Sequence, residues 1–255
     1  MTIRIGIAGI TGRMGRLLAE EVVAAGAHLT GGIGLDAPNE RSFELFADIT
    51  QLAAASDAVL DFTHASLAQS HAAALTASGK AWVLGTTGLS AADEAAVTAA
   101  AERIPVVYAS NFSPGVNLVL ALAERMGAAL PDDAYDAEIV EMHHRQKVDA
   151  PSGTAIAIGR AVAKGRGVSL DDNTETGRHG HTGARKTGTI GFAALRGGQV
   201  VGEHSLIFAA ASEQIVLTHR AFDRRVFATG AVRAALWAAN RPARLYSMMD
   251  VLGMA

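Results

Sequence analysis

The chain has 255 residues, of which 49% are hydrophobic, and this length allows one large domain or two modest ones with a well-filled core. Its formal net charge of −3 at pH 7 gives no electrostatic reason to expect nucleic acid or an anionic membrane as a partner, and its lack of cysteine excludes disulfides, thiolate catalysis and cysteine-bound zinc. No apolar stretch is long enough to span a bilayer and the first residues alternate like a strand rather than a leader peptide, so we expect a soluble, cytoplasmic protein.

The chain opens with the pattern of a strand, a glycine-rich turn and a helix. Residues 3–8 alternate as a strand does, and Gly9, Gly12 and Gly15 follow directly before an amphipathic helix. Such glycines let a backbone approach a pyrophosphate, and the helix N-terminus adds free N–H groups and a partial positive charge. The spacing G-x-x-G-x-x-G departs from the common G-x-G-x-x-G, so a tight turn without a ligand is an equally good interpretation of the spacing alone. As a dinucleotide site, the turn would use Gly9, Ile10, Thr11, Gly12, Arg13 and Met14.

A second strand is predicted over residues 28–33, and it leads to Asp36. An acidic residue about twenty positions beyond the glycines usually binds the adenine ribose hydroxyls, and Asp36 is the only acid in that place. The alternative interpretation is that Asp36 is a turn residue before Pro38.

Further strands are predicted over residues 58–62, 81–84 and 106–108, with helices between them. Strands that alternate with helices predict a parallel sheet, and cofactors bind at the C-terminal ends of its strands. The loops at those ends contain Gly85, Thr86 and Thr87 after one strand, and Ala109, Ser110, Asn111 and Phe112 after the next.

The pattern changes after a helix that Ser113 and Pro114 begin. Runs at 189–195, 200–209 and 213–219 then follow one another without intervening helices, and so predict a largely antiparallel sheet. We expect this sheet to belong to a second domain with its own architecture.

The expected fold class is therefore α/β with two domains. Residues 1–114, completed by residues 225–255, are predicted to form a Rossmann-like dinucleotide-binding domain with a parallel sheet. Residues 115–224 are predicted to form an α+β substrate-binding and oligomerisation domain with a mostly antiparallel, open sheet.

Residues 141–154, E-M-H-H-R-Q-K-V-D-A-P-S-G-T, concentrate reactive groups in one segment. The segment follows an alternating strand, contains His143, His144 and Lys147, and places Pro151 at the predicted start of a helix. Free N–H groups, hydroxyls, a lysine and imidazoles would then converge on one point, which suits an anionic ligand. Each residue taken singly is more often an ordinary polar side chain, but proton donors, a fixed cation and a helix start rarely coincide by chance.

This segment resembles, almost letter for letter, the E-x-H-H-x-x-K-x-D-A-P-S-G-T signature of the 4-hydroxy-tetrahydrodipicolinate reductase family, also called dihydrodipicolinate reductase, of lysine biosynthesis. The glycine turn at 12–15 and the strings at 180–183, 188–192, 202–204 and 230–237 are also similar to recurrent strings of that family. The resemblance therefore covers nearly the whole chain.

The resemblance implies that a small cyclic dicarboxylate, 4-hydroxy-tetrahydrodipicolinate, is reduced to tetrahydrodipicolinate with loss of water in diaminopimelate biosynthesis. It implies NADH and/or NADPH as the cofactor, with the loops at 85–87 and 109–112 beside the nicotinamide. By the same resemblance, His143 is the acid/base and Lys147 the proton donor. The substrate carboxylates would be held by His144, Ser152, Gly153 and Thr154.

Two further expectations concern the cofactor and the assembly. Family members often have Glu-Arg where this chain has Gly34-Leu35, so the arginine expected to bind a 2′-phosphate is missing and we expect NADH to serve at least as well as NADPH. The family is tetrameric through the sheet of its second domain, which implies a homotetramer. The apolar residues expected to form one sheet face in need of a cover are Ile190, Phe192, Ile207 and Phe208.

Two other functions remain open from the residues. A metal hydrolase could use His143, His144, His179 and His181, although adjacent histidines on a strand point to opposite faces, and we expect no metal. A nucleotide-sensing binding protein could keep the fold without the chemistry, although an intact pair of His143 and Lys147 favours an enzyme.

Overall fold

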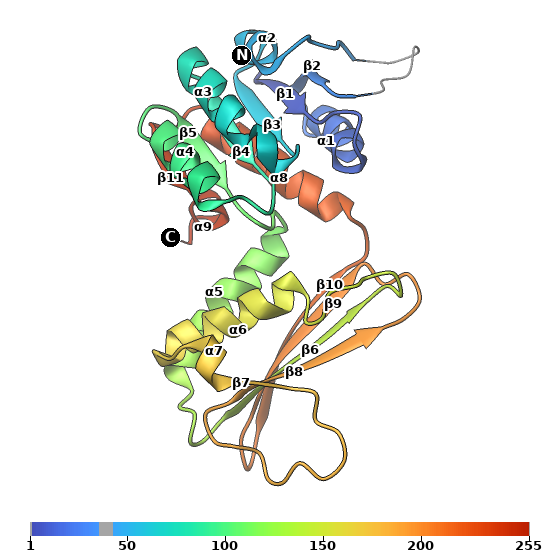
Figure 1. Cartoon of the computed structure of the whole chain (residues 1–255), viewed down its shortest axis with the longest axis vertical. Helices are drawn as coiled ribbons and strands as arrows, with labels where there is room; N and C mark the ends of the chain where they lie inside the picture. The colour runs from blue at the N-terminus through green and yellow to red at the C-terminus, as the bar shows by residue number, and fades with distance from the viewer. Residues whose placement is uncertain (1, 36–42, 255) are drawn as a thin grey trace. The chain divides into compact units, whose positions relative to one another are not determined.

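The computed structural model describes residues 2–35 and 43–254, and it divides into two compact units (Figure 1). Unit 1 consists of Met1–Pro114 together with Arg225–Ala255, and unit 2 of Gly115–Arg224. Asp36, the predicted ribose ligand, lies outside the described residues, so its role stays a prediction.

Unit 1 is built on a six-stranded sheet in the order β11-β5-β4-β3-β1-β2, with all its strand pairs parallel. The strands are β1 (Arg4–Ala8), β2 (His28–Ile33), β3 (Ala58–Asp61), β4 (Ala81–Leu84), β5 (Pro105–Tyr108) and β11 (Arg244–Tyr246). Every residue of β3 and β4 is buried, as expected where helices cover both faces of a parallel sheet. The chain leaves β1 towards β2 on one side and reaches β3 on the other, and such switch points are where open α/β sheets bind ligands.

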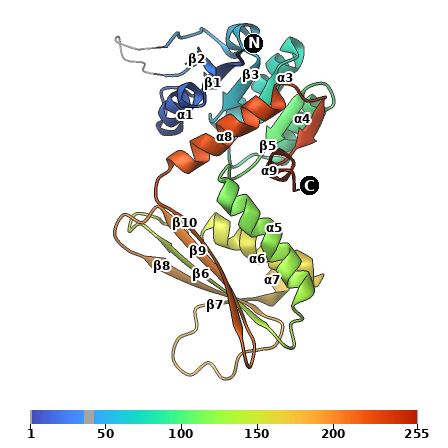
Figure 2. The same ribbon diagram turned by 180° about the vertical axis from the view of Figure 1, so that it is seen from behind.

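Helices cover the two faces of this sheet through two separate apolar cores. The core on one face takes Leu18 and Val22 from α1 (Arg13–Ala24) and Ala228 and Val232 from α8 (Arg225–Ala238). Figure 2 shows α8 lying across the sheet with α1 alongside. The helices that supply the core of the other face are α2 (Ile49–Ala55), α3 (Ala68–Ser78) and α4 (Ala91–Ala101). The short elements η1 (Ala65–Leu67) and α9 (Met248–Leu252) complete the unit.

The helix α8 comes from the end of the chain, yet it packs directly on the loop that follows β5. A Cβ atom at Gly230 would lie 1.7 Å from the carbonyl oxygen of Phe112, a distance at which no side chain fits. The glycine therefore lets the helix approach the loop that is predicted to lie beside the nicotinamide.

Unit 2 contains a five-stranded mixed sheet in the order β10-β9-β6-β8-β7. The strands are β6 (Asp136–His143), β7 (Thr174–Thr176), β8 (Ile190–Arg196), β9 (Gly202–Ala209) and β10 (Gln214–Ala221). Strand β9 pairs antiparallel with both β10 and β6, whereas β8 runs parallel to β6 and β7. The predicted parallel sheet of the first unit and the second sheet of different architecture are thus confirmed.

One face of the second sheet is covered by α5 (Pro114–Ala129) and α6 (Gly153–Arg166), with α7 (Leu170–Asn173) beside them. The prediction that Ile190, Phe192, Ile207 and Phe208 form one uncovered face is wrong. Ile190, Phe192 and Phe208 belong to the buried core under these helices, and the strand register places them beside Ala137 and Ile139 of β6. Because successive strand residues point to opposite faces, Ile207 lies on the other side from Phe208.

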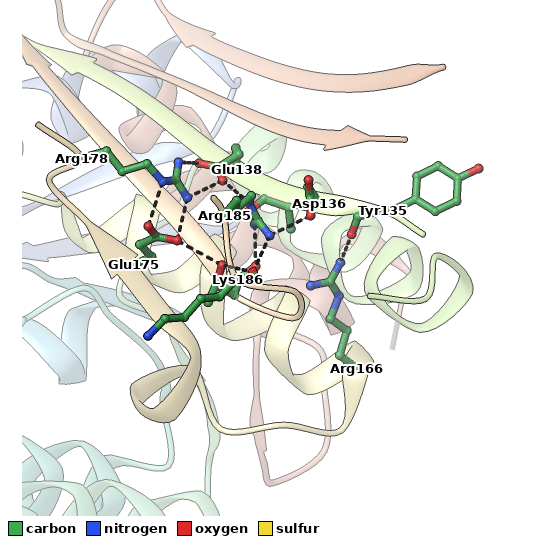
Figure 3. A network of polar contacts seen from close by, with 10 residues as sticks. Tyr135, Asp136, Glu138, Arg166, Glu175, Arg178, Arg185 and Lys186 are labelled. Atoms are coloured by element: carbon green, nitrogen blue, oxygen red, sulfur yellow. Dashed lines mark hydrogen bonds and ion pairs between the residues drawn. The ribbon is translucent and has the colours of Figure 1, made fainter. Parts of the chain in front are cut away.

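The face of this sheet without helices carries a network of charged side chains (Figure 3). Glu138 of β6 accepts hydrogen bonds from Arg178 and Arg185, at distances of 2.8 to 2.9 Å. Glycine at position 191 of the neighbouring strand makes room for that carboxylate, since a Cβ there would lie 1.9 Å from its Oε2. The two arginines thereby tie both ends of the exposed loop between β7 and β8 to the sheet.

All helices in the part of the chain that the structure describes fall short of the length and apolar character that crossing a membrane requires.

The close approach of α8 to the loop after β5 predicts that a side chain at position 230 destabilises the protein. Gly230→Ala should lower the free energy of unfolding by roughly 1–3 kcal/mol, because overpacking outweighs the usual gain in helix propensity. Urea unfolding measures the change. Arg233→Ala, on the exposed side of the same helix, is the control and should stay within about 0.5 kcal/mol of the wild type. An unchanged midpoint for Gly230→Ala would contradict the packing described.

Candidate active site

The glycine-rich turn of unit 1 has the geometry that a pyrophosphate site needs. Gly9 has a φ of +87°, a conformation that side chains other than glycine rarely adopt. A Cβ at Gly15 would lie 2.1 Å from the carbonyl oxygen of Gly9, so this glycine lets α1 begin against the turn. The N-cap of α1 is Gly12, and no side chain caps the first turn. Within residues 2–35 and 43–254, no side-chain cap therefore competes for the helix N-terminus where a phosphate would bind.

A cavity of about 430 Å³ lies beside this turn, within unit 1. Its walls include Gly9, Thr11 and Gly12 from the turn, and Gly34 and Leu35 from the end of β2. A Cβ at Gly34 would lie 2.5 Å from the hydroxyl oxygen of Thr11. The lack of a side chain at Gly34 therefore lets the end of β2 lie directly against the glycine turn. The remaining lining residues are Ile33, Phe46, Ala47, Phe62, Thr63, His64 and Leu67. A cavity between a glycine turn and the end of the second strand fits the adenosine half of a dinucleotide.

The two other predicted cofactor loops are joined to the loop after β3. The hydroxyl of Thr86 donates to the carbonyl oxygen of Thr63 at 3.1 Å, and the ring of Phe112 packs on that of Phe62 with centroids 5.5 Å apart. Gly85 is needed for the same packing, because its Cβ would lie 2.2 Å from the Phe62 ring. All three loops follow neighbouring parallel strands and so share one edge of the sheet.

The predicted cofactor residues differ in what they can offer. The side chain of Ile10 is fully buried in the core, so only its backbone could face a ligand. Arg13 is exposed and Met14 half-buried. Phe112 is 2% exposed, and its ring packs on Phe62, so its side chain stabilises the loop. Thr87, Ala109, Ser110 and Asn111 lie in loops after β4 and β5.

The second site, within unit 2, is organised around the carboxylate of Glu141. This residue is 1% exposed and points to the same side of β6 as His143, two residues later. Its Oε2 accepts from Nδ1 of His143 at 2.6 Å and from Nη1 of Arg196 at 2.8 Å. Its Oε1 accepts from Nη2 of Arg196 at 2.8 Å and from the backbone N–H of Ser152 at 3.1 Å. Burial alone would raise the pKa of Glu141, but hydrogen bonds from Arg196 and His143 hold it below its usual value.

The same arginine reaches the segment that carries the predicted proton donor. Nη2 of Arg196 donates to the carbonyl oxygen of Asp149 at 2.6 Å, and Nζ of Lys147 donates to the Asp149 carboxylate at 2.8 Å. The hydrogen bond from Lys147 lowers the pKa of Asp149. One hydrogen-bonded assembly therefore includes both residues that the sequence singled out for proton transfer, His143 and Lys147.

The helix after this segment begins later than the sequence suggested. Pro151 was predicted at its start, but α6 begins at Gly153 with Ser152 as the N-cap, whose hydroxyl oxygen accepts from the N–H of Ala155 at 3.2 Å. Ser152 is 2% exposed and its Oγ lies 3.1 Å from Nε2 of His204. Its side chain is thus occupied in capping, whereas Gly153 is exposed and Thr154 half-buried. Of the predicted carboxylate ligands, these two are the ones that the helix start presents.

The histidines divide into separate groups. His143 and His204 are 8% and 4% exposed and meet edge to face, with ring centroids 5.0 Å apart. His144 is half-buried, and its Nδ1 has no hydrogen-bond partner in the described part of the chain. His179 and His181 are exposed in the loop between β7 and β8. Over residues 2–35 and 43–254, no three His, Asp or Glu side chains gather where they could hold a metal ion, so the metal hydrolase hypothesis lacks a donor set there.

Three members of this site were not assigned a role from the sequence. Glu141 stands first in the signature, and a carboxylate two residues before a histidine on a strand is the signal that could have indicated its contact. Arg196 and His204 reach the site from β8 and β9, 55 and 63 residues beyond Glu141 along the chain. His204 ends the family-like string at 202–204, but that string does not indicate which residues it contacts, and Arg196 lies outside the strings compared with the family.

Comparisons with known proteins agree over the full length. Residues 3–112 match the family described as dihydrodipicolinate reductase, N-terminus, and residues 115–252 match dihydrodipicolinate reductase, C-terminus. A protein of Granulibacter bethesdensis named 4-hydroxy-tetrahydrodipicolinate reductase is 66% identical over 99% of this chain and 98% of its own length. One of the same name from Gluconacetobacter diazotrophicus is 62% identical over 99% of this chain and 98% of its own.

Among solved structures, the dipicolinate-bound dihydrodipicolinate reductase of Paenisporosarcina sp. TG-14 is similar with a TM-score of 0.81. The match covers 98% of this chain and 99% of that one at 23% identity, and it supports the fold.

The buried histidine pair makes stability depend on pH. The pKa of His204 is lowered from 6.5 to about 4 because burial disfavours its charged form and His143 lies beside it. Between these values the unfolded chain binds a proton that the folded chain does not, so stability falls as pH decreases. By pH 5 the free energy of unfolding should lose roughly 2 kcal/mol relative to neutral pH.

Urea titrations of wild type and His204→Gln from pH 7 to pH 5 measure this loss. The variant should show a flatter dependence, whereas His179→Gln, at an exposed position, should match the wild type. Equal slopes for wild type and His204→Gln would show that His204 is not held neutral by the fold.

Proposed function

The chain belongs to the dihydrodipicolinate reductase family, and from this we infer that it reduces 4-hydroxy-tetrahydrodipicolinate to tetrahydrodipicolinate with loss of water, in the diaminopimelate route to lysine. It is a pyridine-nucleotide-dependent oxidoreductase with a dinucleotide-binding N-terminal unit. The observation that carries the assignment is the assembly in unit 2 that joins His143, Glu141, Arg196, Asp149 and Lys147 by hydrogen bonds. We assign the cofactor to unit 1 and the substrate to unit 2. The biosynthetic role fits a location in the cytoplasm.

The substrate carboxylates need cations and donors, and the segment after β6 supplies both. Lys147 contributes a positive charge, and the N-terminus of α6 contributes the N–H groups of Gly153 and Thr154 and the hydroxyl of Thr154. A Cβ at Gly153 would meet nothing within 4 Å, so the approach to this helix end is open. We assign His144 to the second carboxylate, since its Nδ1 is one of the few buried polar atoms of the described residues without a partner.

We assign the protonation of the substrate after hydride transfer to His143 and Lys147. A reduced pyridine nucleotide, when bound, supplies a hydride. Loss of the 4-hydroxyl group together with a ring proton, as water, gives a conjugated imine. Hydride addition to that imine leaves electron density that must be protonated, which is work for a general acid. His143 is held by its Nδ1, which leaves Nε2 to exchange a proton, and the ammonium of Lys147 provides a second source. Burial of His143 keeps bulk water from competing with it.

The phosphate turn would be completed by Gly9, Ile10, Thr11, Gly12, Arg13 and Met14, with Gly85, Thr86, Thr87, Ala109, Ser110, Asn111 and Phe112 on the nicotinamide side. These assignments are supported by the cavity beside the turn and by the shared sheet edge.

We also propose a homotetramer formed through the face of the second sheet without helices. On this face Leu195 and Val216 are 51% and 50% exposed, and the strand register pairs Leu195 with Met142 and Val216 with Ile207. Exposed apolar side chains on a sheet face favour a cover from another subunit. The charged network around Glu138 occupies one end of the same face.

The function is tested by steady-state oxidation of NADH and of NADPH with enzymatically generated substrate. Gly34 and Leu35 offer no cation at the end of β2, and a carboxylate at Asp36 would repel a 2′-phosphate. We therefore expect kcat/KM with NADH at least equal to that with NADPH. A markedly higher kcat/KM with NADPH would refute the assignment of Asp36, and no oxidation with either nucleotide would refute the function.

The role of Lys147 is tested by Lys147→Arg, which keeps the charge but binds its protons too tightly to release one readily. Nucleotide binding should persist, while kcat should fall about 10²–10⁴-fold with a smaller change in KM. Lys164→Arg, on an exposed lysine that pairs with Glu124, is the matched control and should behave as wild type. Near-normal kcat in Lys147→Arg would reduce this lysine to a carboxylate anchor.

A further inference from the structure

The buried carboxylate of Glu141 accepts hydrogen bonds from four donors, and this determines which ring nitrogen of His143 carries a hydrogen. Glu141 is 1% exposed and accepts from His143, from both Nη atoms of Arg196 and from the N–H of Ser152. An ionised carboxylate only accepts hydrogen bonds, and Arg196 remains protonated at any ordinary pH. The atom of His143 that faces it, Nδ1, therefore carries a hydrogen in both the neutral and the charged imidazole.

The opposite nitrogen of the same ring faces a position without a side chain. A Cβ at Gly202 of β9 would lie 3.0 Å from Nε2 of His143, closer than most such contacts. Glycine at this position thus leaves Nε2 unobstructed, while Glu141 holds the other side of the ring. The imidazole is thus held through Nδ1, and no side chain at position 202 crowds its Nε2.

Arg196 extends this control to the segment that carries Lys147. One guanidinium bonds both oxygens of Glu141 and the carbonyl oxygen of Asp149, and Asp149 holds the ammonium of Lys147. Because guanidinium is planar and binds in a fixed fork, the strand end and the loop are set in one relative geometry. The cation also neutralises Glu141, so the imidazole stands next to a neutral pair and not beside a bare anion.

We propose that Glu141 and Arg196 are positioning residues for the reduction: the carboxylate fixes His143 as the Nδ1–H form with Nε2 free for proton exchange, and the guanidinium balances that charge and aligns the loop of Lys147. The kinetic part rests on the proposed function, whereas the form of the imidazole does not. Other titratable groups surround the pair from each neighbouring element: His204 on β9, His219 on β10, and His144, Lys147 and Asp149 in the loop.

The kinetic test compares Glu141→Gln with Arg196→Met. Each should lower kcat roughly 10- to 100-fold, since loss of alignment at a reacting group has effects of that size, with little change in KM for the nucleotide. The readout is the dependence of kcat on pH. One limb of the wild-type profile should disappear in His143→Gln, and the pH at which this limb lies is compared between the variants. Glu141→Gln leaves an unbalanced cation and should move this limb to lower pH by about one unit, whereas Arg196→Met leaves an unbalanced anion and should move it to higher pH by a similar amount.

Matched controls exist on the same strand. Glu138→Gln and Arg178→Met remove the same charges from a pair on the opposite face of β6 and should leave the limb in place. Arg196→Lys restores the charge without the fork, so the limb should return to its wild-type position while kcat stays reduced. Thermal unfolding and fluorescence titration with NADH check that each variant is folded.

The independent readout is the nitrogen NMR spectrum of protein labelled with ¹⁵N-histidine, where the His143 signal is assigned by its loss in His143→Gln. At alkaline pH the wild type should show the neutral ring with its hydrogen on Nδ1, and Glu141→Gln should show a mixture or the other form. Limbs that stay fixed or move the same way in both variants, or a wild-type ring protonated on Nε2, would overturn the proposal. Should the wild type oxidise neither nucleotide, the proposed function fails, but the NMR result still decides the inference on His143.

Discussion

The candidate site depends on the burial of one negative charge. An ionised carboxylate in a protein interior costs several kcal/mol unless hydrogen bonds and a counter-charge offset the loss of water. Glu141 meets that requirement with donors from its own strand, from β8 and from the start of α6. Those donors cannot relax independently, because the loss of any one leaves a buried charge partly unsatisfied. The requirement of a single carboxylate therefore determines where the imidazole of His143, the fork of Arg196 and the first turn of a helix lie.

Unit 1 also has a buried carboxylate that accepts several hydrogen bonds, at the end of β3. Asp61 is fully buried and accepts from Nδ1 of His71 at 2.8 Å, from the indole N–H of Trp82 at 3.2 Å, and from the N–H and hydroxyl of Thr63. Thr63 in turn accepts from Thr86 through its carbonyl oxygen. A strand-end carboxylate thus orders the loops along the carboxyl edge of the sheet. In both units, a buried carboxylate at a strand end thus helps to position a candidate binding loop.

Those features of the fold and the site that depend on local sequence patterns could be predicted from the sequence. The glycine turn, the alternation of strands and helices in unit 1 and the segment 141–154 were all predictable, because glycine conformation, periodicity and helix starts act over a few residues. Contacts between distant strands were not. Arg196 meets Glu141 only because β8 pairs with β6 in a parallel register that sets His143 opposite Arg196, and that register has no local signature. The prediction of one uncovered apolar face failed for two reasons. The side of the sheet that the helices cover has no local signature, and the adjacent residues Ile207 and Phe208 were placed on one face although strand alternation separates them.

The order of segments in unit 1 bears on how the protein is made. Its sheet and first helices come from residues up to Pro114, but α8, which completes one core, begins at Arg225 after the whole of unit 2. Domains emerging from a ribosome fold as units once their chain is available. Unit 2 is continuous and can close during synthesis, whereas unit 1 exposes apolar surface around Leu60, Val83 and Val107 until its last segment arrives. A nascent chain that ends before residue 225 therefore leaves this apolar surface of unit 1 without the helix that covers it, so the unit reaches its complete core only when the last segment has been made.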